Sequence, residues 1–261
     1  MVFGFGRGSA APLSTTAAGE RIYAIGDVHG SYKELRSVLG LIENHVEKLP
    51  KAASTHIILL GDLIDRGPDS AKVLEYLYKL QRQTKNVVVL MGNHEELMLR
   101  ALDGEAGMLR AWMRTGGDTT LRSFGIEPPS RDDDPREALD LVRRTIPAEW
   151  VAWIRALPLT ARSGDYLFCH AGIRPGVALK RQKRADLLWI RDEFLNDDET
   201  RHEAIVVHGH SISTEVEMRP YRIGIDTGAY RTGTLTALYL EGEAREILSA
   251  GGPAGEEERA A

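Results

Sequence analysis

The most constraining feature of this sequence is a short apolar run that ends in a glycine and a carboxylate. Thr55–Leu60 is rich in isoleucine and leucine, which is typical of a buried strand, and Gly61 and Asp62 follow it directly. Asp65 and Arg66 come soon after in the same loop. A carboxylate at the end of a buried strand is costly to bury unless a cation meets it. The run therefore predicts a charged site at the edge of a core sheet.

The same pattern recurs at four further predicted strands. Each strand ends in Asp, Asn or His beside a small residue, and glycine allows the sharp turns and close approaches that converging side chains require. Oxygen and imidazole ligands gathered in this way suit a transition-metal site. The strands are Arg21–Ile25, Asn86–Met91, Tyr166–Cys169 and Ala204–Val207, and they lead into Gly26-Asp27-Val28-His29-Gly30, Gly92-Asn93-His94-Glu95, His170-Ala171-Gly172 and His208-Gly209-His210-Ser211.

The order of the predicted elements favours an α/β (α+β) fold. The first three strands are each followed by a ligand-bearing loop and a helix, which argues for a largely parallel sheet covered by helices, with the site at the carboxyl ends of the strands. The first helix has Ser31 at its N-cap and Glu34 placed to complete a capping box. Later strands are joined by short turns that suggest antiparallel pairing. We predict two packed mixed sheets flanked by helices, the later strands being 166–170, 204–208, 221–225, 234–240 and 244–248.

The chain is long enough for one large domain. We expect a single domain over residues 20–250, between a flexible N-terminal tail at 1–19 and a flexible C-terminal tail at 251–261. Residues 103–158 show no strand pattern and read as a helical elaboration that walls the cleft. Its tryptophans, Trp112, Trp150 and Trp153, are expected to be core or cleft-wall residues.

The composition excludes several classes of protein. The formal net charge is −5 and the isoelectric point about 5.9, whereas a nucleic-acid-binding protein usually has a basic excess. The single cysteine, Cys169, excludes an internal disulfide, favours a reducing compartment and is expected to be a small core residue. No apolar run approaches the ~20 residues of a membrane span, and no secretory signal is evident. We therefore expect a cytoplasmic protein without membrane or nucleic-acid partners.

The loop residues together predict a pair of metal ions. Asp27 and His29 can both reach one ion, and Asp62 can bridge that ion to a second. Two divalent ions held about 3.5–4 Å apart are a standard arrangement for cleaving phosphate esters, because a hydroxide bridging them is a strong nucleophile at neutral pH. Such ligands suit Mn, Fe, Co and Zn. The predicted ligands of the second ion are Asn93, His170 and His210.

The remaining charged residues of the loops predict the proton transfer. His94, directly after Asn93, is placed to protonate the leaving alkoxide as a general acid. Asp65 can accept a hydrogen bond from the other ring nitrogen and fix the tautomer. Arg66 can clamp two phosphoryl oxygens in a fork. His94 and Asp65 are thus the predicted catalytic pair, and Arg66 is a predicted phosphate-binding residue.

Two neighbouring residues leave alternatives open. His208 lies two positions before His210, so both could point into the site. We favour His210 as the metal ligand and expect His208 to contact the ligands without binding the metal itself. Glu95 is given no catalytic role and is expected to contact a strand or an arginine. Each histidine taken alone would more often be a hydrogen-bonded polar residue than a ligand, so the metal prediction depends on the whole set.

These motifs resemble, in order, those of the phosphoprotein phosphatase family of metallophosphoesterases. They span most of the chain, from residue 27 to about 233; the first three are highly specific together, and the last two are short. They are Gly26-Asp27-Val28-His29-Gly30, Gly61-Asp62-Leu63-Ile64-Asp65-Arg66-Gly67, Gly92-Asn93-His94-Glu95, His170-Ala171-Gly172 and Gly209-His210-Ser211.

The resemblance implies a calcineurin-like β-sandwich flanked by helices, a dinuclear metal centre that often holds manganese in bacterial members, and hydrolysis of phosphoserine and phosphothreonine in proteins or peptides. The chain resembles the compact bacterial and phage branch, whose members often also accept phosphotyrosine. In that branch a second phosphate-binding arginine follows a tryptophan. Trp189-Ile190-Arg191-Asp192 is similar, so Arg191 is a candidate for this role, with a surface salt bridge as the alternative. Asp226-Thr227-Gly228 resembles the closing turn of the family.

Two other functions remain open beside a serine/threonine protein phosphatase. A symmetrical dinucleoside tetraphosphate hydrolase shares the first motifs and a similar closing turn, but such enzymes often depart from Asp-Arg-Gly in the second motif, where this chain has Asp65. An inactive scaffold of the same fold would have lost a ligand or the acid, whereas every expected position is filled. The sequence therefore favours a metal-dependent phosphomonoesterase acting on phosphoproteins.

Overall fold

Alternate side chains of the central strands face two different layers, as expected for strands buried on both sides. In β1 (Glu20–Ile25), Ile22 belongs to the same buried cluster as Phe168 of another sheet. Its neighbour Tyr23 belongs to a cluster that includes helix residues such as Leu35. One face of this sheet therefore packs on a second sheet and the other face packs on helices.

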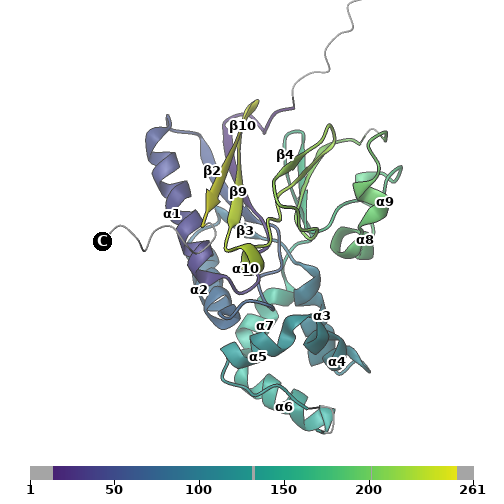
Figure 1. Ribbon diagram of the computed structural model, residues 1–261. Helices are drawn as coiled ribbons and strands as arrows, with labels where there is room; N and C mark the ends of the chain where they lie inside the picture. Colours follow the sequence, from purple (N-terminus) through teal and green to yellow (C-terminus); the bar gives the residue numbers. More distant parts are fainter. Residues whose placement is uncertain (1–13, 131–132, 201, 252–261) are drawn as a thin grey trace, which may run out of the picture.

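The computed structural model describes residues 14–130, 133–200 and 202–251 and has two five-stranded sheets packed face to face. Helices cover the outer face of each sheet, and a further group of helices, coloured teal, lies beyond one end of the sandwich (Figure 1). The prediction of two packed mixed sheets flanked by helices is confirmed.

The first sheet contains the parallel strands that the sequence predicts. In the order of hydrogen bonding it consists of β10 (Ala244–Ala250), β9 (Leu235–Glu241), β1, β2 (Ser54–Leu59) and β3 (Val87–Val89). β1 pairs in parallel with β2, and β2 in parallel with β3. The last two strands of the chain extend this sheet rather than the second one, since β9 pairs antiparallel with β1 and with β10.

The second sheet is also mixed. It consists of β4 (Thr160–Ser163), β5 (Tyr166–Cys169), β6 (Ile205–His208), β8 (Arg222–Gly224) and β7 (Glu217–Met218). The expected antiparallel pairing holds for β4 with β5 and for β7 with β8, but β5, β6 and β8 pair in parallel. β4 and β7 were not predicted, because β4 is a polar, largely exposed segment and β7 is only two residues long.

The helices agree with the sequence periodicity, with one local difference. Ser31 is at the N-cap of the first helix, but its side chain makes no capping hydrogen bond, so the expected capping box with Glu34 is absent. The Gly116-Gly117 pair is expected from sequence to break the helix before it, and Gly116 indeed has the non-helical angles φ 110° and ψ 9° at a kink between two helical stretches. The helical elements are α1 (Tyr32–Lys48), α2 (Ser70–Gln83), α3 (Asn93–Leu102), α4 (Met108–Trp112), the π-helical η1 (Met113–Gly117), α5 (Asp118–Ser123), α6 (Pro135–Thr145), α7 (Ala148–Arg155), the 3₁₀ turn η2 (Leu179–Arg181), α8 (Arg184–Trp189), α9 (Asp192–Leu195) and α10 (Ala229–Thr232).

The inner part of the predicted N-terminal tail is packed against the sandwich. Thr16 is buried; its hydroxyl donates to the Glu20 carbonyl and accepts from the Gly242 backbone N–H. Residues 14–19 therefore differ from the expectation of a flexible tail. The rest of that tail, residues 1–13, and residues 252–261 of the C-terminal tail lie outside the described residues.

Candidate dinuclear metal centre

The loops that follow the strands have strained backbones where the sequence predicts chemistry. Among the described non-glycine residues, positive φ angles occur at five positions, and each is a predicted ligand, catalytic or phosphate-binding residue. Such a conformation costs on the order of 1–3 kcal/mol and persists where the surrounding structure imposes it, often at functional sites. The five residues are His29 (φ 44°), Asp62 (49°), Asp65 (73°), Arg66 (66°) and His210 (66°).

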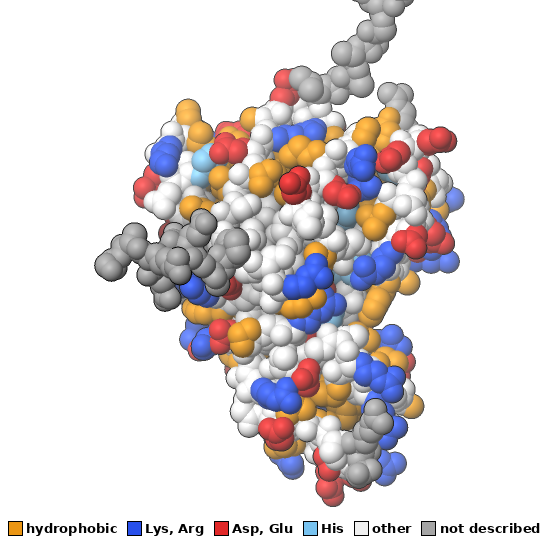
Figure 2. Space-filling view, in the orientation of Figure 1, with side chains coloured by type: hydrophobic (Ala, Val, Ile, Leu, Met, Phe, Trp, Pro, Cys, Tyr) orange, Lys and Arg blue, Asp and Glu red, His pale blue; other side chains and the backbone are white. Residues whose placement is uncertain are grey.

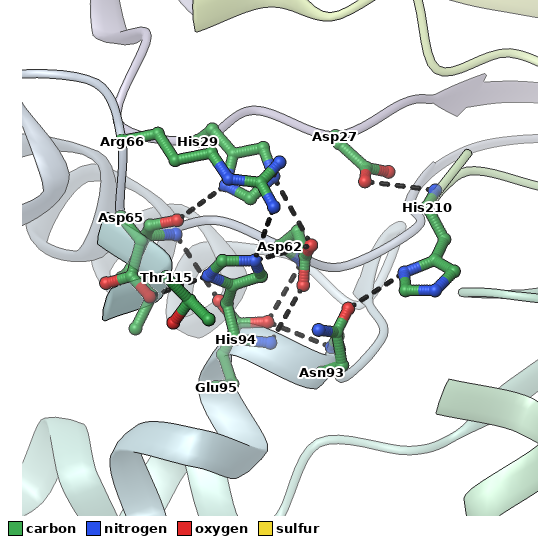
Figure 3. A network of polar contacts seen from close by, with 12 residues as sticks. Asp27, His29, Asp62, Asp65, Arg66, Asn93, His94, Glu95, Thr115 and His210 are labelled. Atoms are coloured by element: carbon green, nitrogen blue, oxygen red, sulfur yellow. Dashed lines mark hydrogen bonds and ion pairs between the residues drawn. The ribbon is translucent and has the colours of Figure 1, made fainter. Parts of the chain in front are cut away.

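Two glycines let these loops approach one another closely. A Cβ atom on Gly92 would lie 2.2 Å from the backbone nitrogen of Asp62, and one on Gly209 would lie 2.0 Å from Oδ1 of Asp27. Only a residue without a Cβ fits such contacts. The loops after β1, β2, β3 and β6 consequently bring their side chains to one place, at the carboxyl ends of the strands (Figure 3).

Four predicted ligands form one tight group, which we call site 2. Oδ1 of Asn93 lies 2.7 Å from Nε2 of His170 and 2.9 Å from Nδ1 of His210. Oδ1 of Asp62 lies 3.4 Å from the same His170 nitrogen. Nδ1 of His170 donates to the Leu60 carbonyl at 3.0 Å, so in the neutral ring Nε2 presents a lone pair to these oxygens. Several acceptors thus face one another at a point where a cation would satisfy them all.

A second group, site 1, shares Asp62 and has ligand atoms of His29, Asp62 and His94 within 4.8 Å of one another. Nδ1 of His29 donates to the Ile64 carbonyl at 2.8 Å, so its Nε2 lone pair faces Oδ2 of Asp62 at 3.3 Å. Arg66 extends over this group, with Nη1 3.0 Å from Nε2 of His29 and Nη2 3.0 Å from Nε2 of His94 (Figure 3). Asp62 therefore turns one oxygen to each site, as a bridging ligand requires.

Asp27, predicted to share an ion with His29, belongs to neither of these close groups, and site 1 contains His94 in its place. Oδ2 of Asp27 accepts from the His210 backbone N–H at 3.0 Å, while its Oδ1 is buried without a hydrogen-bond partner. Oδ2 of Asp226 is likewise buried and unpartnered. Buried carboxylate oxygens without donors are costly unless a cation balances them. The donor set therefore fits two divalent transition-metal ions, with Asp27 as a predicted ligand.

The protonation states of the group suit metal binding. Burial lowers the pKa of His29 to about 3 and that of His210 to about 2, so both rings are neutral at pH 7 and keep a lone pair. Burial alone would raise the pKa of Asp62, but the surrounding histidines, His170 foremost, hold it well below its usual range. Burial and the carboxylates of Asp226 and Asp62 raise the pKa of Asp27, the effect that a bound cation would reverse.

His94, which belongs to the close group of site 1, also forms a buried pair with Asp65. Nδ1 of His94 donates to Oδ2 of Asp65 at 2.7 Å, which leaves Nε2 directed towards Asp62 and Arg66. Burial alone would lower the pKa of His94, but the carboxylates of Asp62 and Asp65 outweigh it and raise the pKa above its ordinary value. A raised pKa favours the protonated form of the imidazole, which is the form that a general acid uses.

Glu95 has a structural role that the sequence did not specify. Its carboxylate accepts the backbone N–H groups of Asp62 and Gly92 on Oε2, both at 2.9 Å, and those of Leu63 and Ile64 on Oε1. Burial raises its pKa to about 7. Glu95 therefore ties together the loops after β2 and β3, and it contacts the backbone rather than the arginine considered from sequence.

The other predicted residues take different positions. Arg191 is exposed, and its side chain makes no hydrogen bond or ion pair with the described residues, so the alternative of a surface salt bridge is not seen there. Burial chiefly, and to a smaller extent the charge of Arg191, lower the pKa of His170, which places Arg191 near site 2. His208 is buried outside both groups. Cys169 is fully buried in a core cluster, and burial raises its thiol pKa to about 12, as expected for an inert core residue.

Three residues near the site were not singled out as functional from the sequence. Trp112 and Thr120 both donate to the Asp65 carboxylate from the helical segment, and no local pattern links them to Asp65. Tyr230 packs its ring 5.1 Å from Cζ of Arg66 and edge-on against His29. Its place just after Asp226-Thr227-Gly228 was the available signal, since that turn closes the motif set.

Comparisons with known proteins agree with this geometry. A model of the calcineurin-like phosphoesterase family matches residues 20–236. The chain belongs to this family. The metallophosphoesterase fold and family predicted from the motifs are thus confirmed, and His/Asp groups of the kind found here imply divalent metal ions.

The sequence relatives carry names that differ from the predicted substrate. The chain is 30% identical over 160 residues to a symmetrical bis(5'-nucleosyl)-tetraphosphatase of Nitrosospira multiformis, covering 61% of this chain and 46% of that protein. It is 25% identical over 232 residues to the bis(5'-nucleosyl)-tetraphosphatase PrpE [asymmetrical] of Oceanobacillus iheyensis, covering 83% and 87%. The aligned region is thus less than half of the first relative. Neither relative is named as a protein phosphatase.

Solved structures support the fold. A putative diadenosine tetraphosphatase is similar with TM-score 0.62 and 21% identity, covering 93% of this chain and all of that one. A protein serine/threonine phosphatase from Saccharomyces cerevisiae is similar with TM-score 0.53 and 15% identity, covering 93% and 86%. Among the described residues, no helix is both long and apolar enough to cross a membrane.

Proposed function

We propose that this protein is a metal-dependent hydrolase of dinucleoside polyphosphates, with a bis(5'-nucleosyl) tetraphosphate as substrate. The observation that carries the proposal is that relatives aligned over 61% and 83% of this chain are named bis(5'-nucleosyl)-tetraphosphatases. This reverses the preference from the motifs alone, in which the presence of Asp65 favoured a protein phosphatase. The alternative stated there becomes the main proposal.

Two arginines of the site region and the basic side chains on one face of the molecule support a polyanionic substrate. The chain as a whole is acidic, yet Figure 2 shows Lys and Arg side chains gathered across the middle of one face with pale-blue histidine among them. Arg66 contacts His29 and His94 of site 1, and the charge of the exposed Arg191 acts on His170 of site 2. Guanidinium groups bind phosphoryl oxygens in a bidentate fork. We assign these two arginines to the phosphate chain of the substrate.

An exposed aromatic ring supports a nucleoside substituent. Trp189 is 38% exposed, its indole N–H donates to Glu96 at 2.7 Å, and its ring centroid is 6.5 Å from that of His210. Arg184 also pairs with Glu96, so the indole is held in place before substrate arrives. Bases stack on such fixed rings. A nucleobase on Trp189 would leave the adjoining phosphates near Arg191 and site 2.

The reaction divides among the residues as follows. Two divalent ions, with manganese as the first choice, would be bound here. Asp27, His29 and Asp62 would hold the first ion. Asp62, Asn93, His170 and His210 would hold the second. Bound there, they supply an activated water and polarise phosphoryl oxygens. His94 gives its Nε2 proton to the leaving oxygen, and Asp65 holds the ring with Nδ1 as donor. Arg66 binds the phosphoryl group beside His94.

A phosphomonoester in a protein remains the second candidate substrate, because the His94–Asp65 pair is suited to protonating a basic leaving group. A nucleotide leaves readily through its phosphate oxygen and needs little protonation, whereas a serine or threonine alkoxide is strongly basic and needs an acid. His94 has a raised pKa and a fixed tautomer, which suits the more basic leaving group. The single cysteine still favours a cytoplasmic location for either enzyme.

The test compares substrates on the manganese-loaded protein. We expect kcat/KM for diadenosine tetraphosphate to exceed that for phosphoserine, phosphothreonine and phosphotyrosine peptides by at least tenfold. Product analysis then separates symmetrical cleavage, which gives two ADP, from asymmetrical cleavage, which gives ATP and AMP. Trp189→Ala should raise KM for the dinucleotide and leave p-nitrophenyl phosphate unaffected. A higher kcat/KM for a phosphopeptide would reject the proposal in favour of the second candidate.

A further inference from the structure

The carboxylate of Asp65 is held by more donors than His94 alone. Asp65 is fully buried, and Oδ2 accepts from Nδ1 of His94. Oδ1 accepts from the Thr120 hydroxyl at 2.6 Å, and the Trp112 indole N–H lies 3.0 Å from both carboxylate oxygens. Thr120 also accepts the backbone N–H of Asp65 at 2.9 Å, so it holds both ends of the residue. The carboxylate is therefore fixed on every side.

The two additional donors come from the helical segment that follows the third motif. Trp112 is the last residue of α4, and Thr120 is in α5. Between them, the Gly116 carbonyl accepts the backbone N–H of Arg66 at 3.2 Å, and a Cβ on Gly116 would lie 2.7 Å from that nitrogen. The segment thus contacts the Asp65–Arg66 loop at three separate points, although neither donor belongs to a motif that was assigned to chemistry.

We propose that Trp112 and Thr120 are positioning residues for the general acid. They orient the Asp65 carboxylate so that Oδ2 meets Nδ1 of His94, and this fixes the ring with its Nε2 proton directed at the leaving oxygen. The proposal rests on phosphoester hydrolysis at this site, as proposed above. Without these donors Asp65 is free to rotate about its Cβ–Cγ bond, and His94 loses its preferred tautomer and direction.

A purely structural role for Trp112 is the alternative to exclude, since the indole is fully buried in the main core cluster. Trp112→Phe keeps an aromatic ring and removes the N–H, and Thr120→Val keeps the shape and removes the hydroxyl. Trp153 offers a matched control, because its indole N–H, in α7, donates to Gln81 of α2 at 2.7 Å and has no hydrogen bond with Asp65. Trp153→Phe removes an equivalent hydrogen bond without touching the acid.

The kinetic test uses the manganese-loaded enzyme and a series of aryl and alkyl phosphates with increasingly basic leaving groups. Trp112→Phe and Thr120→Val should lower kcat by about 10–100-fold on the most basic leaving group, the usual worth of an outer partner of a catalytic group, and by less than about threefold on p-nitrophenyl phosphate. In an Asp65→Asn background the same substitutions should add nothing. Trp153→Phe should behave like the wild type throughout.

A second measurement is independent of turnover. The Nδ1 proton of His94, hydrogen-bonded to a carboxylate, should give a low-field proton NMR resonance that Asp65→Asn abolishes. Trp112→Phe and Thr120→Val should broaden or shift it, and Trp153→Phe should not. An unchanged resonance in both variants, or an equal kinetic loss on all leaving groups, would overturn the proposal. A wild type that cleaves aryl phosphates but not diadenosine tetraphosphate would count against the proposed substrate alone.

Discussion

Replacing Asp62 by asparagine should remove one metal ion and keep the other. The His94 backbone N–H donates to Oδ1 of Asp62 at 3.0 Å, so an asparagine will place its oxygen there and its NH₂ at the Oδ2 position. Oδ1 is the oxygen that faces His170 in site 2, and Oδ2 is the one that faces His29 in site 1. The variant therefore keeps an oxygen ligand at site 2 and presents an N–H donor to site 1.

The magnitude follows from what each site loses. Loss of an outer partner of a ligand already costs about 10–100-fold in affinity, so loss of the ligand atom itself should cost site 1 at least about 100-fold. That factor corresponds to about 2.7 kcal/mol or more. Site 2 loses only charge and should weaken less. Calorimetric titration of the metal-free protein with Mn²⁺ should show two sites in the wild type and one in Asp62→Asn.

Double variants identify which ion remains. Adding His210→Ala to Asp62→Asn should abolish the residual binding, whereas adding His29→Ala should leave it unchanged. Asp186→Asn is a matched control, because Asp186 is a buried carboxylate that pairs with Arg174 outside both groups. Loss of both ions in Asp62→Asn, or a residual ion that depends on His29, would refute the assignment of one oxygen to each site.

Three further predictions follow from the same structure. His94→Asn should keep its metal ions while kcat falls by roughly 10²–10⁴-fold on phosphates with basic leaving groups, and less on p-nitrophenyl phosphate; an equal loss on both would reject the acid role. Burial raises the pKa of Cys169 from 9.0 to about 12, so the contribution of the neutral thiol to stability is constant below pH 9 and is lost as the pH rises towards 12. At pH 8.5 the buried thiol should react with a disulfide reagent only after the protein unfolds. Phe168→Ala, in the core between the sheets, should lower the free energy of unfolding by about 3–5 kcal/mol in urea denaturation, whereas Leu141→Ala, 44% exposed, should change it by less than about 0.5 kcal/mol.

The metal-facing loops could be predicted because their chemistry is local in sequence. Asp62 directly follows a buried strand, and parallel strands bring their carboxyl ends to one edge of a sheet, so its meeting with His170 required only the correct fold. The grouping of the predicted ligands into two metal sites was harder to predict from the sequence. Asp27 accepts a hydrogen bond from the His210 backbone N–H and lies outside the close group of His29, and the spacing of these residues in the sequence does not encode this difference.

The supports of the acid could not be predicted, for a different reason. Helical periodicity predicts that Trp112 is buried. It does not identify the hydrogen-bond partner of the indole N–H, because that partner, Asp65, is 47 residues away in the sequence. The same holds for Thr120, whose partner Asp65 is 55 residues away. Short strands such as β7 also depend on pairing that is decided only by the tertiary structure. Contacts between residues far apart in the sequence produce no periodic pattern in it.

The general acid His94 and the exposed residues at the edge of the site affect different aspects of substrate choice. A well-positioned His94 accelerates departure of a basic alkoxide and does little harm to departure of a nucleotide. The hydrogen bonds that hold Asp65 therefore suit a phosphomonoester but do not exclude a dinucleotide. Selection must then come from groups that touch what lies beyond the scissile phosphate. We propose Trp189 and Arg191 for this role, because one is a ring held by Glu96 and the other is an exposed cation whose charge acts on His170 of site 2. Substitutions there should alter the ratio of kcat/KM values between a dinucleotide and a phosphopeptide, whereas substitutions around Asp65 should alter the dependence on the leaving group.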